Sequence, residues 1–186
     1  MRLSTLLLLM SIICASCTKK DIKQPENEIT LPIIANSISN QQIRAFAEDK
    51  NGHIWIGTFN GLNRYDKSTG LFQNHTASDA QSDGLTHSSI WCIVKDNQGT
   101  LWLGTYFGGV NYFNPEYEIY SRYMYSPIEK KGLSNPVVGR TIEDKDGNLW
   151  IGTEGGGLNY YNRRTREFKW FRPEIGPNSI SHNNIK

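Results

Sequence analysis

The sequence predicts an all-β protein built from short strands, and three observations lead to this prediction. Glycine occurs 17 times in 186 residues and aromatic residues make up 11% of the chain, a composition that favours strands and tight turns over helix packing. A short motif centred on a tryptophan recurs at Trp55, Trp102 and Trp150, at intervals of 47 and 48 residues. Turn-forming residues separate short apolar segments within each interval. The chain is therefore expected to repeat one small antiparallel sheet.

The first 37 residues precede the repeats and have the pattern of a targeting segment. Residues 1–16 contain one charge, Arg2, and then an apolar run from Leu6 to Cys14, as in a secretion signal. This run is shorter than the roughly 18 to 20 residues of a membrane-spanning helix. The sequence Ala15-Ser16-Cys17 resembles the bacterial lipobox, although Cys14 stands where that pattern usually has leucine. We expect lipidation of Cys17, with simple removal of a signal peptide as the alternative.

A lipid on Cys17 would anchor an exported chain to a bacterial membrane, facing the periplasm or the cell surface. Residues 17–37 are expected to form a polar tether with neither helix nor strand. Pro25 and Pro32 lie within this tether, and no hydrophobic period runs through it.

The repeats occupy residues 38–84, 85–132 and 133–179, and residues 180–186 begin a fourth. Each repeat is predicted to form four antiparallel strands, which in the first repeat are residues 43–48, 53–58, 61–65 and 70–75. Four strands in a repeat of about 40 to 50 residues is the sequence signature of a β-propeller blade. Ile54 and Ile56 share one face of the second strand and Trp55 lies on the other. Both faces are therefore apolar, as in a blade packed between two neighbours.

The spaced motifs of the repeats resemble those of a known family. The run from Glu48 to Gly52 is followed by His53 to Thr58 and by Gly61 to Tyr65, and close copies recur in phase in the other two repeats. This combination is similar to the two-component regulator propeller repeat. In that family the repeat builds the extracytoplasmic sensor region of hybrid two-component systems, which usually continue into an immunoglobulin-like module, a membrane helix and a histidine kinase. Many members respond to oligosaccharides.

The resemblance implies a sensor in signal transduction by phosphorelay, with a small molecule or oligosaccharide as its ligand. A kinase region or partner protein would carry the signal onward, and no cofactor is implied. A closed propeller has roughly 4 to 8 blades, so three repeats would leave two apolar blade faces open to aggregation or to a partner. One hypothesis is a truncated gene product that lacks further blades. The other is a ring completed by further copies of the chain.

Ligand contacts are expected on the face of the propeller that carries the loops before the first strand and between the second and third strands of each blade. Loops on a rigid scaffold often bind ligands, and rings, amides and carboxylates suit sugars. If the first strand is innermost, its arginines and Trp91 would line the central channel, where an arginine pairs with a carboxylate-bearing sugar. The candidate ligand-binding residues are Asn40, Arg44, Phe59, Asn60, His87, Trp91, Tyr106, Phe107, Asn135, Arg140 and Glu154.

Each candidate has a structural alternative. The loop residues would then be solvated, Trp91 would be a packing residue, and the arginines would form surface ion pairs. The three repeated tryptophans are expected to be structural, because a residue present once in each blade serves the blade itself.

Other classes of function find little support in the sequence. The net charge of +2 is spread along the chain, which argues against nucleic-acid binding. The four histidines lack metal-ligand spacing, and the run from Asp144 to Gly147 lacks the ligand positions of a calcium loop and predicts a tight turn. Cys92 is expected to be a small buried residue. We therefore expect a binding protein and not an enzyme, with no metal and no cofactor. Two rival interpretations are a fragment of a propeller lyase or glycan-acting enzyme, and a lipoprotein interaction scaffold.

Overall fold

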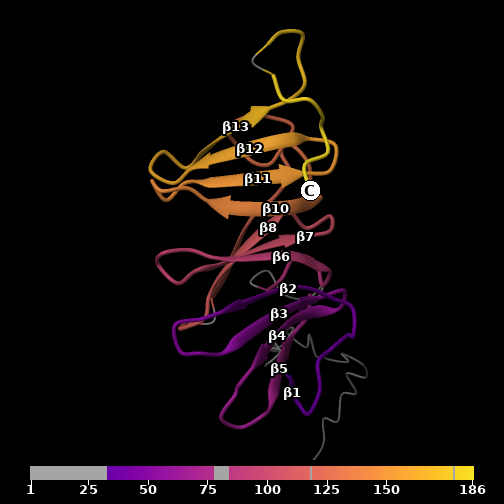
Figure 1. Cartoon of the computed structure of the whole chain (residues 1–186), viewed down its shortest axis with the longest axis vertical. Coiled ribbons are helices and arrows are strands. Elements are labelled where there is room, and N and C mark those ends of the chain that lie inside the picture. The colour runs from indigo at the N-terminus through magenta and orange to yellow at the C-terminus, as the bar shows by residue number, and fades with distance from the viewer. Residues whose placement is uncertain (1–32, 78–83, 118, 178) are drawn as a thin grey trace, which may run out of the picture. The chain divides into compact units, whose positions relative to one another are not determined.

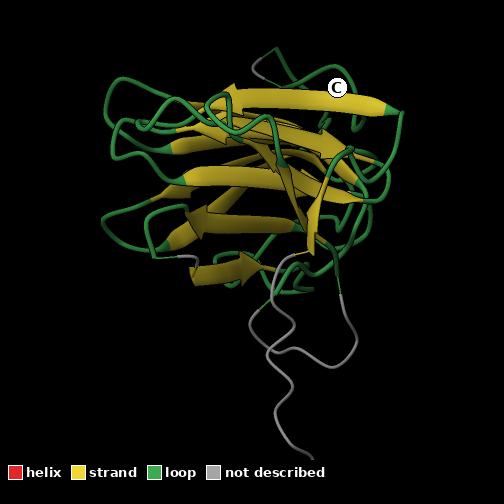
Figure 2. Ribbon diagram, turned by 90° about the horizontal axis from the view of Figure 1, so that it is seen from below, coloured by secondary structure: helices red, strands yellow, loops and turns green. Residues whose placement is uncertain are grey.

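The structure is a computed structural model that describes residues 33–77, 84–117, 119–177 and 179–186, and these form stacked antiparallel sheets (Figure 1). Only strands and loops occur in this part of the chain (Figure 2). None of the described residues therefore belongs to a helix long and apolar enough to cross a membrane. The predicted signal segment and Cys17 lie outside the described residues.

Three sheets follow one another along the chain, one for each repeat. From β2 onward, consecutive strands within each sheet pair antiparallel, which confirms the predicted four-stranded blades. Blade 1 comprises β2 (Ile43–Glu48), β3 (Ile54–Thr58), β4 (Gly61–Tyr65) and β5 (Phe72–His75). Blade 2 comprises β6 (Ile90–Lys95), β7 (Leu101–Thr105), β8 (Val110–Asn114) and β9 (Ile119–Tyr123). Blade 3 comprises β10 (Val138–Glu143), β11 (Leu149–Thr153), β12 (Gly157–Asn162) and β13 (Glu167–Phe171).

A further strand lies where the sequence analysis expects none. Strand β1 (Ile33–Ala35) falls within the predicted tether of residues 17–37 and pairs antiparallel with β5, so that blade 1 has five strands. A strand of three residues is too short to leave a periodic pattern in the sequence, and its pairing partner is almost 40 residues away in the chain. The expectation of a strand-free tether is therefore wrong for this short segment.

The repeated aspartate and tryptophan of each blade belong to one hydrogen-bonded unit. In blade 2, Asp96 Oδ1 accepts the N–H groups of Gln98 (2.9 Å) and Thr100 (2.8 Å), which closes the turn between β6 and β7. The other carboxylate oxygen, Oδ2, accepts the indole N–H of Trp102 at 2.8 Å. The same indole bond joins Asp49 to Trp55 at 2.8 Å and Asp144 to Trp150 at 3.0 Å. Each of the three tryptophans therefore stabilises the turn between the first two strands of its own blade.

Neighbouring blades pack where a glycine follows the repeated tryptophan by two positions. Strands β2, β6 and β10, the inner edges of the three sheets, lie next to one another. Gly57 of β3 faces the side chain of Ile90, and Gly104 of β7 faces the side chain of Val138. Because these glycines have no side chain, the first residue of the next blade can approach the sheet closely.

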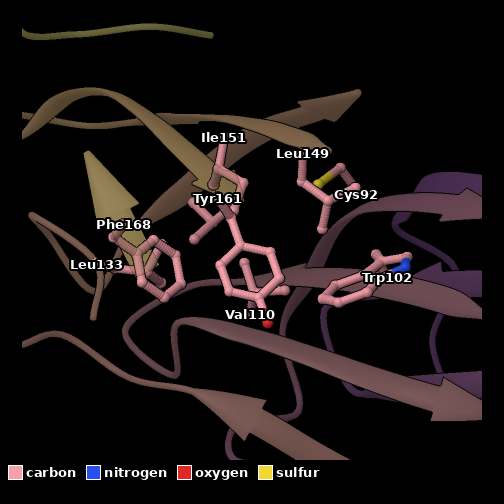
Figure 3. Packing of buried hydrophobic residues seen from close by; sticks show 9 residues of the cluster. Cys92, Trp102, Val110, Leu133, Leu149, Ile151, Tyr161 and Phe168 are labelled. Carbon is pink, nitrogen blue, oxygen red and sulfur yellow. The ribbon is translucent and has the colours of Figure 1, made fainter. Parts of the chain in front are cut away.

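Apolar clusters fill both boundaries between blades. The cluster between blades 1 and 2 comprises Trp55, Leu62, Leu85, Ile90, Leu101, Leu103 and Phe113. Figure 3 shows residues of the cluster between blades 2 and 3, which comprises Cys92, Trp102, Val110, Leu133, Val138, Leu149, Ile151, Tyr161 and Phe168. Both faces of blade 2 are thus buried, as the alternation of apolar residues in its strands predicts.

Residues 180–186 lie on blade 3 in the way that each blade lies on its predecessor. The N–H of Ile185 donates to the carbonyl of Thr153 at 3.0 Å, and its side chain meets Gly152 as Ile90 meets Gly57. At the other end of the stack, Ile43 holds the same repeat position and is 51% exposed, and Phe46 of the same strand is 73% exposed. The described blades therefore form an unclosed ring.

Candidate functional site

The inner strand of every blade begins with a β-bulge at the same repeat position. The pairing of the first two strands shifts between Ile43 and Ala45, and the equivalent shifts in blades 2 and 3 make Trp91 and Gly139 the bulged residues. Arg44 is the bulged residue of blade 1. A bulge leaves its residue outside the regular ladder and redirects the side chain. Arg44 and Trp91 are therefore freed from the blade faces, although both belong to strands.

Five predicted ligand-binding residues from two blades come together around these bulges. Arg44 Cζ lies 4.5 Å from the centroid of the Phe59 ring and 5.5 Å from that of Trp91. The Trp91 ring stacks on Tyr106 with centroids 5.1 Å apart and planes at 10°. The Tyr106 ring meets Phe107 edge to face at 4.4 Å. We call Arg44, Phe59, Trp91, Tyr106 and Phe107 the aromatic–arginine cluster.

Ser89, which the sequence analysis did not single out, fixes two rings of the cluster. Its hydroxyl oxygen accepts the indole N–H of Trp91 at 3.2 Å, and its carbonyl accepts the backbone N–H of Tyr106 at 3.1 Å. Ser89 itself is only 4% exposed, so the two rings are attached to a rigid part of blade 2. No sequence signal distinguishes this serine from the other loop serines.

Phe107 ends the cluster in an unusual backbone conformation. Its φ angle is 71° and its side chain is 56% exposed. The left-handed region is uncommon for residues other than glycine and costs a bulky residue conformational energy. In a core, the packing of a buried ring can offset the cost of such a backbone conformation. For an exposed ring it cannot, and strained residues of this kind occur preferentially at binding sites.

The loops that carry the cluster are joined from blade to blade. The N–H of Gly61, the first residue of β4, donates to the carbonyl of Ser88 in the segment before β6 at 2.6 Å. The equivalent bonds run from Gly109 to Pro136 at 3.0 Å and from Gly157 to Asn183 at 2.8 Å. This bond places Phe59 of blade 1 beside the inner strand of blade 2, so the cluster is built across a blade boundary.

Three further candidates share a structural role in the turn before the inner strand. Asn40 Oδ1 accepts the N–H of Gln42 at 2.8 Å, His87 Nδ1 that of Ser89 at 3.0 Å, and Asn135 Oδ1 that of Val137 at 2.8 Å. His182 makes the same bond to Asn184 at 2.9 Å. Side chains that bond to the backbone two residues ahead stabilise turns, and the equal repeat positions of the four residues were a signal for this role.

His87 also lies beside the cluster. Its ring is 6.3 Å from that of Tyr106 and nearly perpendicular to it. Partial burial lowers the pKa of His87, and Nδ1 accepts a hydrogen bond, so the neutral imidazole carries its proton on Nε2. His87 can therefore offer one N–H donor next to the aromatic rings.

The remaining candidates lie apart from the cluster. Asn60 is exposed in the loop next to Phe59, and its backbone N–H bonds to Thr58 Oγ1 at 3.1 Å. Arg140 is exposed on β10, and Glu154 forms an ion pair with Lys186 at 2.9 Å. In the part of the chain that the structure describes, Arg140 and Glu154 have no contact with the cluster.

Neither a metal-binding group of side chains nor an accessible thiol occurs among the described residues. Among them, no group of three His, Cys, Asp or Glu side chains is arranged to hold a metal ion. The Cys92 thiol is buried between blades 2 and 3, its Sγ is 3.8 Å from Thr141 Oγ1, and burial raises its pKa. A protonated, inaccessible thiol is a packing residue and not a nucleophile, as the sequence analysis expects.

Comparison with known proteins finds similar structures among extracellular domains of bacterial proteins assigned as signalling systems. The extracellular domain of a B. thetaiotaomicron protein assigned as a hybrid two-component system is 23% identical with a TM-score of 0.67, over 75% of this chain and 20% of that chain. The extracellular domain of a B. thetaiotaomicron protein assigned as a one-component system is 29% identical with a TM-score of 0.60, over 72% of this chain and 18% of that chain. This chain thus spans about a fifth of the length of these relatives.

Virginiamycin B lyase from Staphylococcus aureus also matches, at 10% identity and a TM-score of 0.54, over 75% of this chain and 44% of that chain. At this identity the likeness shows a shared fold alone. A search of the curated proteins finds no match.

The sequence model of the two component regulator propeller matches three segments, residues 37–60, 84–107 and 132–155. Each match runs from the turn before the inner strand, through the aspartate and tryptophan of the hydrogen-bonded unit, to the loop after the second strand. One match therefore falls on each blade, in the phase that the structure shows. The three blades of this chain are repeats of the two-component regulator propeller family.

Proposed function

We propose that this chain is the ligand-sensing propeller of an extracytoplasmic signalling protein, and that the aromatic–arginine cluster is the surface that contacts the ligand. The observation that carries the proposal is the convergence of five side chains from blades 1 and 2, two from the bulges of the inner strands and three from the loops after the second strands. The relative assigned as a one-component system supports an extracellular location. The signal would pass to a kinase region or partner protein through binding alone.

We propose a carbohydrate as the ligand class. A sugar ring has an apolar C–H face that stacks on aromatic rings and a rim of hydroxyl groups that pair with amides and N–H donors. The stacked rings of Trp91 and Tyr106 are suited to contact the apolar C–H face of the sugar ring. The Nε2 donor of His87, whose ring lies next to that of Tyr106, is suited to pair with the hydroxyl groups of the sugar.

Replacement of Trp91 by alanine is expected to weaken carbohydrate binding by about tenfold or more, if loss of a stacking ring costs what it does for a nucleic-acid base, on the order of 1–3 kcal/mol. A glycan array would identify bound sugars, and isothermal titration calorimetry would compare wild type with the variant. Phe46→Ala is the matched control, since Phe46 is an exposed ring of an inner strand that lies on the open face of blade 1. The proposal fails if wild type binds no glycan or if Trp91→Ala binds as tightly as wild type.

We further propose that the chain is exported and anchored by a lipid on Cys17. The sequence Ala15-Ser16-Cys17 after a short apolar run supports this anchor. Wild type expressed in a bacterium is expected to incorporate labelled palmitate and to fractionate with membranes, whereas Cys17→Ala is expected to lose both properties. Cys14→Leu is the control, because it removes the other cysteine of the segment and places the usual leucine of the lipobox pattern at that position. Equal labelling of wild type and Cys17→Ala would contradict the anchor.

No observation on the described residues favours the rival functions. The glutamate of the loop face, Glu154, is ion-paired with Lys186, so it offers no free carboxylate for a lyase or glycan-acting enzyme. The exposed Ile43 and Phe46 resemble an interaction surface. Their repeat equivalents, Ile90 and Ile93, pack against blade 1, so this face is shaped for a neighbouring blade and not for an unrelated protein.

A further inference from the structure

We propose that the ligand of the aromatic–arginine cluster bears a carboxylate, as an acidic sugar does, and that Arg44 binds it. This inference rests on the proposed function and narrows its ligand class. It comes from the contrast between two arginines of this chain that both stack on aromatic rings.

Arg163 shows how the fold uses a stacked arginine structurally. Its Cζ lies 5.0 Å from the centroid of the Trp102 ring. Its Nη2 donates to Asp96 Oδ2 at 2.7 Å and lies 3.5 Å from Glu143 Oε1. Burial alone would raise the pKa of Asp96, but bonds from Trp102 and Arg163 hold it below its usual value. Two carboxylates thus neutralise this guanidinium inside the blade 2–3 boundary.

Arg44 has the aromatic contacts without the carboxylates. Its guanidinium lies over Phe59 and near Trp91, and no hydrogen bond or ion pair joins it to any residue in the described ranges 33–77, 84–117, 119–177 and 179–186. The acidic residue of its own strand, Glu48, lies at the far end of β2 and pairs with Lys67 at 2.7 Å. No carboxylate of the described residues therefore neutralises the positive charge at the inner edge of blade 1.

The rings prepare Arg44 for a planar anion. Stacking occupies a face of the guanidinium and leaves its edge, where all five N–H donors point, for an acceptor. A carboxylate matches two of those donors in a bidentate pair, which is stronger and more specific than a neutral hydrogen bond. The two rings also limit the rotamers of Arg44, so less side-chain entropy is lost when the anion binds.

A sugar ring stacked on the same rings would reach Arg44 with its substituent. Trp91 is shared by both contacts, because Arg44 lies 5.5 Å from its centroid while Tyr106 stacks at 5.1 Å. The repeat equivalents of Arg44 are Trp91 and Gly139, so this position supplies a charge in blade 1 only. One residue would therefore decide the preference for an acidic sugar.

Matched pairs of ligands test the inference on the whole chain. Oligosaccharides of glucuronate, galacturonate and mannuronate are compared with their methyl esters, which keep the ring and remove the charge. Calorimetry is expected to show at least one acid binding about tenfold or more tighter than its ester, and Arg44→Gln is expected to abolish this difference. Arg44→Lys keeps the positive charge but loses the planar guanidinium that pairs with a carboxylate through two hydrogen bonds. Its acid-to-ester difference in affinity should lie between those of wild type and Arg44→Gln. Arg172→Gln is the control, since Arg172 is exposed and stacks only on Trp170, at 4.7 Å.

The outcomes separate this inference from the proposed function. If esters or neutral glycans bind as tightly as the acids and Trp91→Ala loses that binding, the cluster binds sugars, but the inference that the ligand bears a carboxylate is wrong. If an acid binds better than its ester and Arg44→Gln keeps the difference, another cation recognises it and the role of Arg44 is wrong. If no glycan of any kind binds, both proposals fail.

Discussion

Replacement of Gly104 by alanine is expected to lower the free energy of unfolding by roughly 1–3 kcal/mol, the usual cost of an added methylene in a packed core. A methyl group at this position would overlap Cys92 Sγ and lie 2.7 Å from Val138 Cγ1. Carbon atoms pack at about 3.5–4 Å, and Cys92 and Val138 are 3% and 0% exposed. Val138, and with it blade 3, would have to move away from blade 2, and the Cys92 side chain of blade 2 itself would have to turn aside. Urea denaturation followed by circular dichroism measures the loss.

Two variants show whether the loss arises at the blade boundary. Gly152→Ala changes the equivalent glycine of blade 3, whose neighbour is Ile185, a half-buried residue, so its cost should be smaller. The double variant Gly104→Ala, Val138→Ala should be more stable than the sum of the single effects predicts, by about 0.5–3 kcal/mol, because the shortened side chain leaves room for the methyl group. A Gly104→Ala protein as stable as wild type would mean that blades 2 and 3 do not pack as described.

The blades could be predicted from the sequence because each repeated residue has a repeated local task. The aspartate closes a turn, the tryptophan binds that aspartate, and the glycine admits the next blade, so all three recur at one spacing. Strand β1 escaped prediction for the opposite reason. It occurs once, has three residues, and forms only by pairing with β5.

The candidate site was partly predictable for the same reason. Aligned repeats identified Arg44, Trp91 and the loop rings as positions that differ between blades, and the structure brings these together. The bulge that redirects Arg44 and Trp91 could not be foreseen, since it is a shift in pairing between strands and not a property of either sequence. For Asn40 and Asn135, as for His87, the structure adds a bond to the backbone of the residue's own turn, and contact with a ligand stays a prediction.

His75 is expected to make the protein less stable as the pH falls from about 6.5 to 4. Its ring is enclosed by aromatic neighbours, with Trp55 at 5.6 Å, Phe113 at 5.9 Å and Tyr120 at 6.1 Å. Its Nε2 is buried and has no hydrogen-bond partner within the described part of the chain. Burial, with a smaller contribution from the charge of Arg64, lowers the pKa of His75 from 6.5 to about 4.

The sign of the effect follows from proton binding. Between the two pKa values the unfolded chain binds a proton that the folded chain does not, so acidification favours unfolding in this range. Each pKa unit corresponds to about 1.4 kcal/mol, and the shift from 6.5 to about 4 therefore amounts to a loss of roughly 3 kcal/mol once pH 4 is reached. Above pH 6.5 both states are neutral at this residue and the contribution does not change.

His75→Phe should remove this part of the pH dependence and keep the packing, because Tyr123 and Phe171 hold the same position in blades 2 and 3. Urea denaturation at a series of pH values would give the difference in unfolding free energy between variant and wild type. That difference should grow as the pH falls from 6.5 to 4 and level off below, while paired carboxylates such as Asp96 contribute equally to both proteins and cancel. His182→Asn is the control: it removes an exposed imidazole, and asparagine caps the same turn at Asn40 and Asn135. A difference that stays constant from pH 7 to pH 4 would mean that His75 is accessible to protons in the folded protein, and that blades 1 and 2 are packed less tightly around it than Trp55 and Phe113 indicate.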